Sequence, residues 1–279
     1  MQVLDSIQTL REALGRARRP LGLVPTMGYL HEGHLSLVRR ARAESATAAV
    51  SIFVNPTQFG PQEDLTTYPR DLSRDLALLE KEGVDIVFAP SLEEIYPRGF
   101  DTWVHVDLLA RRLEGEARPG HFRGVCTVVL KLFYLFRPER AYFGQKDAQQ
   151  ALVVQRMARD LNTGTEVVVC PTLREPDGLA MSSRNVYLDH HQRRAATVLY
   201  RSLCLAQEML RRGERDADKI RTAMMALLQS EPLVSKVEYV SIADKETLKE
   251  LEHIGGPALV SLAVRIGRTR LIDNVTLTP

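Results

Sequence analysis

The sequence predicts an α/β fold, a Rossmann-like doubly wound parallel sheet followed by a second, smaller α+β domain. Up to about residue 172, short apolar segments alternate with helix-length amphipathic segments, which is typical of βαβ units. Beyond residue 189 the order changes to helices and then consecutive strand-like segments. A stretch rich in turn-forming residues, 173–185, separates the two patterns. We therefore expect one domain over 1–172 and another over 173–279.

The expected elements follow from apolar periodicity. Short apolar runs rich in β-branched residues predict strands at 21–27, 47–54, 84–90, 140–144 and 165–172. Amphipathic runs predict helices at 34–45, 71–83, 125–136 and 148–161. In the second domain, residues 190–230 predict two helices interrupted at Arg212 and Gly213, and three strands are expected at 237–244, 257–267 and 269–277.

Composition excludes several classes of protein. A net charge of +2 over 279 residues is too small for nucleic-acid binding by bulk electrostatics. No run reaches the roughly 18 apolar residues of a membrane-spanning helix, and the first residues form no apolar secretory core. The three cysteines, Cys126, Cys170 and Cys204, are far apart, which fits a reducing compartment. We expect a cytoplasmic protein with small-molecule partners and with neither a nucleic-acid nor a membrane partner.

The stretch PTMGYLHEGH, residues 25–34, joins the first predicted strand of the sheet to a helix. In a doubly wound sheet ligands bind beyond the carboxyl ends of strands. Helix N-termini there favour phosphate groups. His31 and His34 could donate hydrogen bonds to phosphate oxygens while charge develops on them. Gly28 and Gly33 would allow a nucleotide to approach the backbone closely.

Two other interpretations of the histidine pair are open at this point. The zincin motif HExxH separates its histidines by four residues, whereas HEGH separates them by three. The pair could also be two ordinary histidines at the start of a helix. The combination of strand, PTMG turn, HxGH and helix favours nucleotide binding over both.

Three further polar segments follow predicted strands or lie in the turn-rich stretch. Asn55 and Gln58 offer uncharged amides for hydroxyl or carboxylate groups. Lys146 offers a point charge for phosphates, and Asp147 could cap a helix or bind a ribose hydroxyl. Gln150 lies one turn into the following helix. The segment MSSRN, residues 181–185, places two hydroxyls and a guanidinium in series, which suits phosphate binding.

HxGH after a first strand resembles the signature of the nucleotidyltransferase superfamily that includes class I aminoacyl-tRNA synthetases. The ordered set of segments resembles the pantothenate synthetase family, also called pantoate–β-alanine ligases. The matching segments are PTMGYLHEGH, FVNPTQF, YPR, RPGHFRGV, FGQKD and MSSRN. They extend from about Pro25 to Asn185, and the small second domain also fits the family.

The resemblance implies a role for each matching residue. It implies ATP contacts from Met27, Gly28, Tyr29, Leu30, His31, Glu32, Gly33, His34, Gly144, Gln145, Lys146, Asp147, the Leu173 backbone, Met181, Ser182, Ser183 and Arg184. His34 would be the acid-type catalytic residue, assisted by His31 and Lys146. Gln58 and Gln150 would bind pantoate, with Asn55 and Arg118 as neighbours of the pantoate and β-alanine site.

The resemblance also implies a reaction. Pantoate would react with MgATP to give pantoyl adenylate, which β-alanine would convert to pantothenate and AMP. ATP is thus the expected co-substrate, Mg²⁺ the expected metal, and a homodimer the expected assembly. The chain departs from the family pattern at Gln145 and Ala148, where Glu and Tyr are frequent. The acidic cluster after YPR is also thinner, with Arg74 beside Asp75, so the sequence assigns no protein ligand to the metal.

Two other functions are open from the sequence. Another HxGH transferase could move AMP or CMP onto a phosphorylated acceptor, but this would require additional basic residues for the acceptor's phosphate. The amide-rich FVNPTQF segment favours a small hydroxy acid instead. The chain could also be a nucleotide-binding regulatory module without turnover. Substrate-dependent release of pyrophosphate from ATP distinguishes these possibilities.

Overall fold

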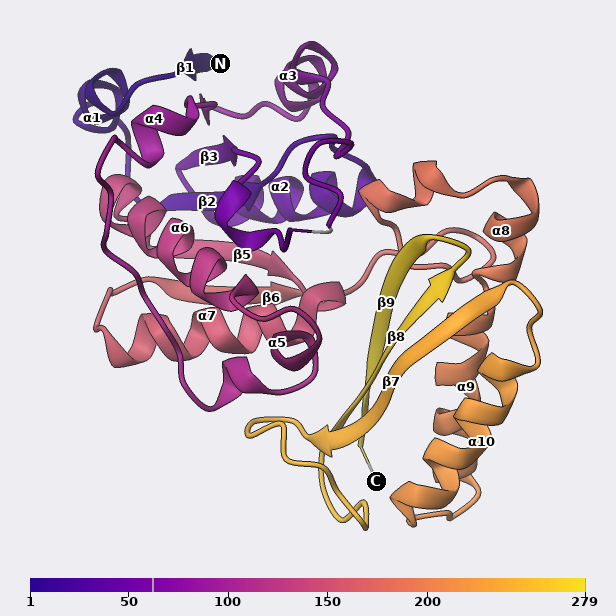
Figure 1. Ribbon diagram of the computed structural model, residues 1–279. Coiled ribbons are helices and arrows are strands. Elements are labelled where there is room, and N and C mark those ends of the chain that lie inside the picture. Colours follow the sequence, from indigo (N-terminus) through magenta and orange to yellow (C-terminus); the bar gives the residue numbers. More distant parts are fainter. Residues whose placement is uncertain (62, 279) are drawn as a thin grey trace. The chain divides into compact units, whose positions relative to one another are not determined.

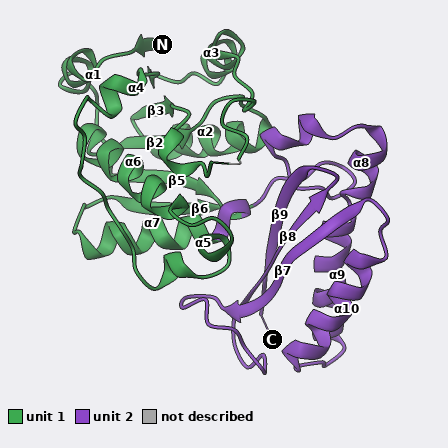
Figure 2. Ribbon diagram, viewed as in Figure 1, with its two compact units in different colours: residues 1–145, 149–171 green, residues 146–148, 172–279 purple. Residues whose placement is uncertain are grey.

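The computed structural model describes residues 1–61 and 63–278 (Figure 1). The chain divides into two compact units (Figure 2). Unit 1 comprises Met1–Gln145 and Gln149–Pro171, and unit 2 comprises Lys146–Ala148 and Thr172–Pro279. The three residues from Lys146 to Ala148 are grouped with unit 2, where the Asn274 side chain donates to the Lys146 carbonyl oxygen at 2.8 Å.

Unit 1 contains a six-stranded sheet in the order β1-β4-β3-β2-β5-β6, with every neighbouring pair parallel. The strands are β1 (Gln2–Leu4), β2 (Leu21–Thr26), β3 (Thr47–Ile52), β4 (Ile86–Phe88), β5 (Arg140–Gly144) and β6 (Glu166–Cys170). The predicted parallel α/β fold is confirmed. Strand β1 was not predicted, because three residues are too few to show a period.

Helices cover both faces of this sheet (Figure 1). They are α1 (Ile7–Leu14), α2 (Glu32–Glu44), α3 (Leu72–Lys81), α4 (Leu92–Ile95), α5 (Glu114–Ala117), α6 (His121–Phe136) and α7 (Ala148–Asp160). One hydrophobic cluster joins the sheet to α2 and α3, through side chains such as Val38 and Leu79. A second cluster joins it to α1, α6 and α7, through side chains such as Leu10, Phe133 and Val154. The sheet is therefore doubly wound, as predicted.

The strand order reverses at β2, which determines where a ligand can bind. From β2 the chain moves outward to β3 and then β4, and it later returns to β5 on the other side of β2. Leu21 of β2 is in register with Thr47 of β3, and Gly22 with Arg140 of β5. At such a reversal the loops after the two strands separate, which opens a crevice at their carboxyl ends. The segment PTMGYLHEGH includes the end of β2 and the turn that follows it, and FG of FGQKD ends β5.

Unit 2 is the smaller α+β unit that the sequence predicted. An antiparallel sheet contains β7 (Val234–Asp244), β8 (Ala258–Ile266) and β9 (Thr269–Leu277). Three helices, α8 (His190–Ala195), α9 (Val198–Arg211) and α10 (Ala217–Gln229), share its core. The predicted interruption at Arg212 and Gly213 is confirmed, because α9 ends at Arg211 and α10 begins at Ala217, but the first predicted helix is divided into α8 and α9. Only Ala196 and Thr197 separate α8 from α9, and both have helical backbone angles, so the apolar period continues across the break.

Candidate active site

The turn between β2 and α2 is held by a carboxylate from α3. Asp75 accepts hydrogen bonds from the backbone N–H groups of Tyr29 and Leu30, both at 2.7 Å. It is 1% exposed, and burial raises the pKa of its carboxyl group while the two N–H groups oppose that shift. Arg74 lies 3.5 Å from the same carboxylate. Asp75 thus stabilises the backbone of the turn by accepting two hydrogen bonds, a role that was not predicted from the sequence.

The turn after β2 has an unusual backbone that depends on the residues at positions 28 and 29. Gly28 and Tyr29 are consecutive positive-φ residues, at +79° and +51°. The left-handed region is costly for a residue with a side chain, so Tyr29 is held there by its surroundings. A Cβ on Gly28 would lie 3.0 Å from both the Asp75 Oδ2 atom and the Ile52 Cγ2 atom. Asp75 and Gly28 together fix the path of the chain into α2.

His31 and His34 cap the N-terminus of α2 reciprocally. The Nδ1 atom of His31, the N-cap residue, accepts from the Gly33 N–H at 3.1 Å. The Nδ1 atom of His34 accepts from the His31 N–H at 3.3 Å. The two ring centroids are 4.0 Å apart. Because both Nδ1 atoms accept, the proton of each neutral ring is on Nε2, and each ring can donate from Nε2.

The other predicted residues of this segment have different environments. Leu30 is completely buried in the core, and its N–H is bound to Asp75, so its side chain cannot reach a nucleotide. Glu32 is exposed and pairs with Arg39 of the same helix at 2.8 Å. Met27 is half-buried and lies against Gln58.

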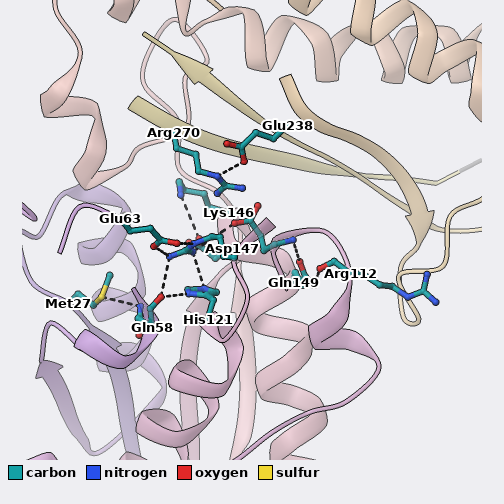
Figure 3. Close-up of polar contacts among 12 residues, drawn as sticks. Met27, Gln58, Glu63, Arg112, His121, Lys146, Asp147, Gln149, Glu238 and Arg270 are labelled. Atoms are coloured by element: carbon teal, nitrogen blue, oxygen red, sulfur yellow. Dashed lines mark hydrogen bonds and ion pairs between the residues drawn. The ribbon is translucent and has the colours of Figure 1, made fainter. Parts of the chain in front are cut away.

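The turn after β3 fixes the orientation of two amide side chains. Gln58, in the 3-10 helix η1 (Pro56–Gln58), accepts at Oε1 from Asn55 Nδ2 at 3.0 Å. The second Nδ2 proton of Asn55 is donated to the Gly124 carbonyl oxygen at 3.1 Å. Gln58 Nε2 donates to the Met27 thioether sulfur at 3.2 Å (Figure 3). Sulfur is a weak acceptor, so a substrate oxygen could replace it at little cost.

A buried histidine anchors the same turn from α6. His121 Nδ1 donates to the Gln58 carbonyl oxygen at 2.8 Å (Figure 3), and its Nε2 accepts from Arg118 at 3.1 Å. Burial, assisted by the charge of Arg118, lowers the pKa of His121 from 6.5 to about 4. Arg118 also binds Glu63 through two hydrogen bonds, at 2.8 and 2.5 Å. Arg118, predicted as a neighbour of the substrate, therefore braces the segment that follows Gln58.

The segment after β5 contains two adjacent glutamines with different roles. Gln149, in the first turn of α7, accepts from the Glu114 N–H at 2.9 Å. It also donates to the carbonyl oxygens of Leu109 and Arg112, at 2.8 and 2.7 Å. Gln150 is half-buried, and its side chain makes no hydrogen bond within residues 1–61 and 63–278. Gln149 thus holds the segment before α6, and Gln150 remains the predicted contact to a ligand.

Unit 2 contains Lys146, Asp147, Leu173 and residues 181–184, whereas Gly144 and Gln145 belong to unit 1. Lys146 and Asp147 are in the 3-10 helix η3 (Gln145–Asp147), directly after Gly144, and their side chains are 3.7 Å apart. The Leu173 carbonyl oxygen accepts from the Met181 N–H at 3.0 Å, which closes the 173–181 segment. Ser182 caps the 3-10 helix η4 (Ser183–Tyr187) by accepting from the Arg184 N–H at 3.3 Å. Ser183 is buried.

A buried ion pair supports the segment that precedes these serines. Arg174 donates to both carboxylate oxygens of Asp273, at 2.6 and 3.0 Å. Burial raises the pKa of Asp273, and the Arg174 contacts oppose that shift. Arg174 also lies over the Tyr200 ring, 4.2 Å from its centroid. These contacts tie the start of the 173–185 segment to β9 within unit 2.

The doubly wound sheet and the reciprocally capped HxGH helix define an α/β protein with a histidine-capped helix terminus beside the strand reversal. The sequence profile of the family described as Pantoate-beta-alanine ligase matches residues 2–276. The chain therefore belongs to the pantoate-beta-alanine ligase family, and like other members it is a ligase that forms an amide bond.

Individual relatives and solved structures agree. The chain is 63% identical to the pantothenate synthetase of Roseiflexus sp. (strain RS-1) over 99% of both chains. It is 55% identical to that of Thermotoga neapolitana, over 99% of this chain and 100% of the relative. The crystal structure of pantothenate synthetase from Thermus thermophilus superimposes with a TM-score of 0.96 at 50% identity, over 100% of both chains.

A further solved structure was obtained with ligands. The Francisella tularensis pantoate-beta-alanine ligase, complexed with beta-gamma ATP and beta-alanine, has a TM-score of 0.81 at 35% identity. The match covers 99% of this chain and 97% of that chain.

The buried His121 should make stability depend on pH. Its folded-state pKa is below the unfolded value, so the unfolded chain binds the extra proton first as pH falls. We expect the free energy of unfolding to decrease between pH 6.5 and pH 4, by roughly 3 kcal/mol at about 1.4 kcal/mol per pKa unit. Urea unfolding of wild type and H121N at several pH values measures this contribution. The asparagine keeps a donor near the Nδ1 position but does not titrate.

H190N changes an exposed histidine and serves as the control. H121N should have a flatter pH dependence than both wild type and H190N. An unchanged slope in H121N would show that His121 is not a neutral, buried group.

Asp75 should be required for the stability of the turn after β2. D75N replaces one acceptor oxygen with an amide donor, which leaves the N–H of Tyr29 or Leu30 without a partner. We expect a loss of about 1–3 kcal/mol in the free energy of unfolding. D71N is the matched control, because Asp71 is the exposed N-cap of α3 and asparagine caps equally well. Equal stability of the two variants in urea unfolding would contradict this role.

Proposed function

We propose that the chain joins pantoate to β-alanine at the expense of ATP, through a pantoyl-adenylate intermediate. The observation that carries this proposal is the reciprocal capping of His31 and His34 at the strand reversal. It supports the proposal that the two imidazoles donate from Nε2 at the strand end where the superfamily handles the α-phosphate of a nucleotide. The family match over residues 2–276 supports the choice of substrates.

In the first step a carboxylate oxygen of pantoate forms a bond to the α-phosphorus of ATP, and the bond to the bridging oxygen of pyrophosphate breaks. In the second step the β-alanine amine forms a bond to the activated carbonyl carbon. AMP leaves with the former carboxylate oxygen, and the amine loses a proton. The mixed anhydride makes the second step favourable, since a carboxylate and an amine do not condense in neutral water.

The proposed work of the protein in the first step is positioning and charge stabilisation. His31 and His34 would donate from Nε2 to oxygens of the α-phosphate as negative charge develops there. Lys146, Ser182, Ser183 and Arg184 would bind the triphosphate. These four residues belong to unit 2, and their part in the proposal rests on their order in the sequence.

Pantoate is the substrate proposed for the two amides Gln58 and Gln150. Gln58 Oε1 is bound to Asn55, so its Nε2–H is the group presented to a ligand, with only a thioether to displace. Asn55 itself is 1% exposed, with both amide protons and its oxygen engaged within the protein. We therefore assign Asn55 to orienting Gln58 and keep Gln58 and Gln150 as the groups that contact pantoate.

Magnesium would bind together with the triphosphate. Among residues 1–61 and 63–278, no group of three or more His, Cys, Asp and Glu side chains is arranged to hold a metal ion. The carboxylate of Asp75 is occupied by two backbone N–H groups. Mg²⁺ retains several waters and binds through phosphates in many ATP-dependent enzymes, which fits this donor set. The ion would neutralise phosphate charge when bound.

We further propose a cytoplasmic homodimer. The three cysteines are unpaired, which suits a reducing compartment, and the dimer rests on the family resemblance. None of the helices formed by the described residues has the length and apolar character needed to cross a membrane. Light scattering of the purified chain measures the assembly.

The experiment that tests the proposed reaction supplies ATP, pantoate and β-alanine and omits each in turn. We expect AMP, pyrophosphate and pantothenate in equal amounts when all three are present. Pantoate alone should support exchange of labelled pyrophosphate into ATP, because the adenylate forms without β-alanine. If exchange does not depend on pantoate, the proposed pantoyl-adenylate intermediate is wrong. If no product forms at all, the chain is a nucleotide-binding module without turnover.

His34→Ala should reduce pyrophosphate exchange by roughly 100- to 1,000-fold, the usual effect of removing one transition-state donor. H34N separates catalysis from capping, because its Oδ1 can still accept from the His31 N–H while the Nε2 donor is lost. We expect H34N to fold as stably as wild type and to be as slow as H34A. Near-normal exchange in either variant would contradict the assignment, and H190A provides the control at an exposed position.

Gln58→Ala should weaken pantoate binding far more than ATP binding. Loss of a hydrogen bond to a charged group predicts roughly a 10- to 100-fold rise in the pantoate KM. The KM for ATP at saturating pantoate should change by less than about threefold, since the Gln58 turn follows a different strand from the histidines. Equal losses for both substrates would remove the assignment of Gln58 to pantoate.

A further inference from the structure

The Tyr96 hydroxyl contacts the amide pair that orients Gln58. Tyr96 directly follows α4, and its hydroxyl donates to Asn55 Oδ1 at 2.9 Å. The Thr57 hydroxyl donates to the same oxygen at 2.8 Å and lies 3.2 Å from the Tyr96 hydroxyl. Burial raises the pKa of Tyr96, so the hydroxyl keeps its proton. Tyr96 lies outside all of the sequence motifs from which the site was predicted.

The Tyr96 ring is held in place by an aromatic cluster. Phe100 packs edge-on against it at a centroid distance of 5.0 Å, and Phe53 lies 6.1 Å away. Trp103 lies 6.5 Å from it with nearly parallel ring planes. The Lys131 ammonium is 5.8 Å from the Tyr96 centroid and 4.7 Å from that of Phe100. The hydroxyl therefore has a fixed position that does not depend on Asn55.

The hydrogen bonds from Tyr96 to Gln58 run in one direction. The Tyr96 and Thr57 hydroxyls donate to the oxygen of Asn55, so the NH₂ group of Asn55 lies on the other side. That NH₂ group donates to the Gly124 carbonyl and to Gln58 Oε1. The oxygen of the Gln58 amide is thereby bound, and its NH₂ group is presented as a donor. A flipped Asn55 would turn its oxygen toward the Gly124 carbonyl, which can only accept, and its NH₂ group toward the Thr57 backbone N–H, which can only donate.

The backbone around these amides leaves no room for rearrangement. A Cβ on Gly124 would lie 2.7 Å from the Gln58 nitrogen, so α6 packs directly on η1. His121 holds the Gln58 carbonyl from the same helix. The main chain of the turn is thus fixed by α6. The Gly124 carbonyl and the Thr57 N–H set the orientation of the Asn55 amide, and the Tyr96 and Thr57 hydroxyls add two hydrogen bonds to its oxygen.

We infer that Tyr96 is a positioning residue for pantoate, which acts through Asn55 to present the Gln58 amide as a donor to substrate oxygen atoms. The inference rests on the proposed function, because it takes pantoate as the ligand of Gln58. It deepens that function by naming a residue outside the recognised motifs. It also assigns a class of ligand to the turn, one that offers an acceptor oxygen to Gln58.

Y96F tests the inference, because it removes one oxygen atom and leaves the ring in its cluster. We expect the pantoate KM in pyrophosphate exchange to rise roughly 3- to 10-fold, the factor for one neutral hydrogen bond. The ATP KM should stay within about twofold of wild type. Y134F is the matched control, since Tyr134 of α6 is 64% exposed and should leave both constants unchanged.

T57V removes the other hydroxyl that donates to Asn55 Oδ1 and should raise the pantoate KM in the same direction. It also keeps the inference testable if Y96F folds poorly. A general loss of stability would instead lower kcat or raise both KM values together.

A double-mutant cycle separates positioning from a purely structural role. In the Q58A background, Y96F should have no further effect on the pantoate KM, since the amide that it orients is gone. An additional 3-fold or larger rise in Q58A/Y96F, or an unchanged pantoate KM in Y96F alone, would overturn the inference. Wild-type exchange that does not depend on pantoate would overturn the proposed function instead, so the two failures are distinguishable.

Discussion

One buried carboxylate determines how the chain leaves the central strand. Asp75 accepts hydrogen bonds from the N–H groups of Tyr29 and Leu30, which lie beyond the end of β2 and have no partner in the sheet. Without it, the left-handed backbone of Tyr29 would have no compensation for its strain. The direction of α2, and with it the position of both imidazoles, follows from this contact. Strand β2, the turn after it and helix α2 are thus held in one arrangement by Asp75 of α3.

The three-residue spacing of the histidines suits helix capping, and capping determines their chemistry. Each Nδ1 atom accepts a backbone proton, so each neutral ring carries its own proton on Nε2. A metal ligand needs an unprotonated ring nitrogen, and here that nitrogen is already used on both rings. The arrangement favours hydrogen-bond donation to an anion over metal binding. The capping hydrogen bonds thereby favour the Nε2–H tautomer, which is the one that can donate from Nε2 to a phosphate oxygen in the proposed reaction.

Much of the fold could be predicted from the sequence, because the strands and helices have strong local periods. The parallel sheet, the smaller α+β unit and the strand-to-helix position of His31 and His34 agree with the structure. The groups that hold the site were not predicted. Asp75 and Tyr96 meet their partners across more than 40 residues, and His121 across 63. No local pattern records such contacts, so only the fold reveals which polar residues brace the site and which can meet a ligand.

The aromatic cluster around Tyr96 gives the unmodified protein an optical reporter. Trp103 is the only tryptophan in the chain, and its ring lies 5.6 Å from Phe100 and 4.7 Å from the Arg123 guanidinium. Indole emission is sensitive to nearby charge and to solvent. Tryptophan emission, excited selectively over that of the eight tyrosines, therefore originates beside Tyr96 and monitors that neighbourhood without any introduced label.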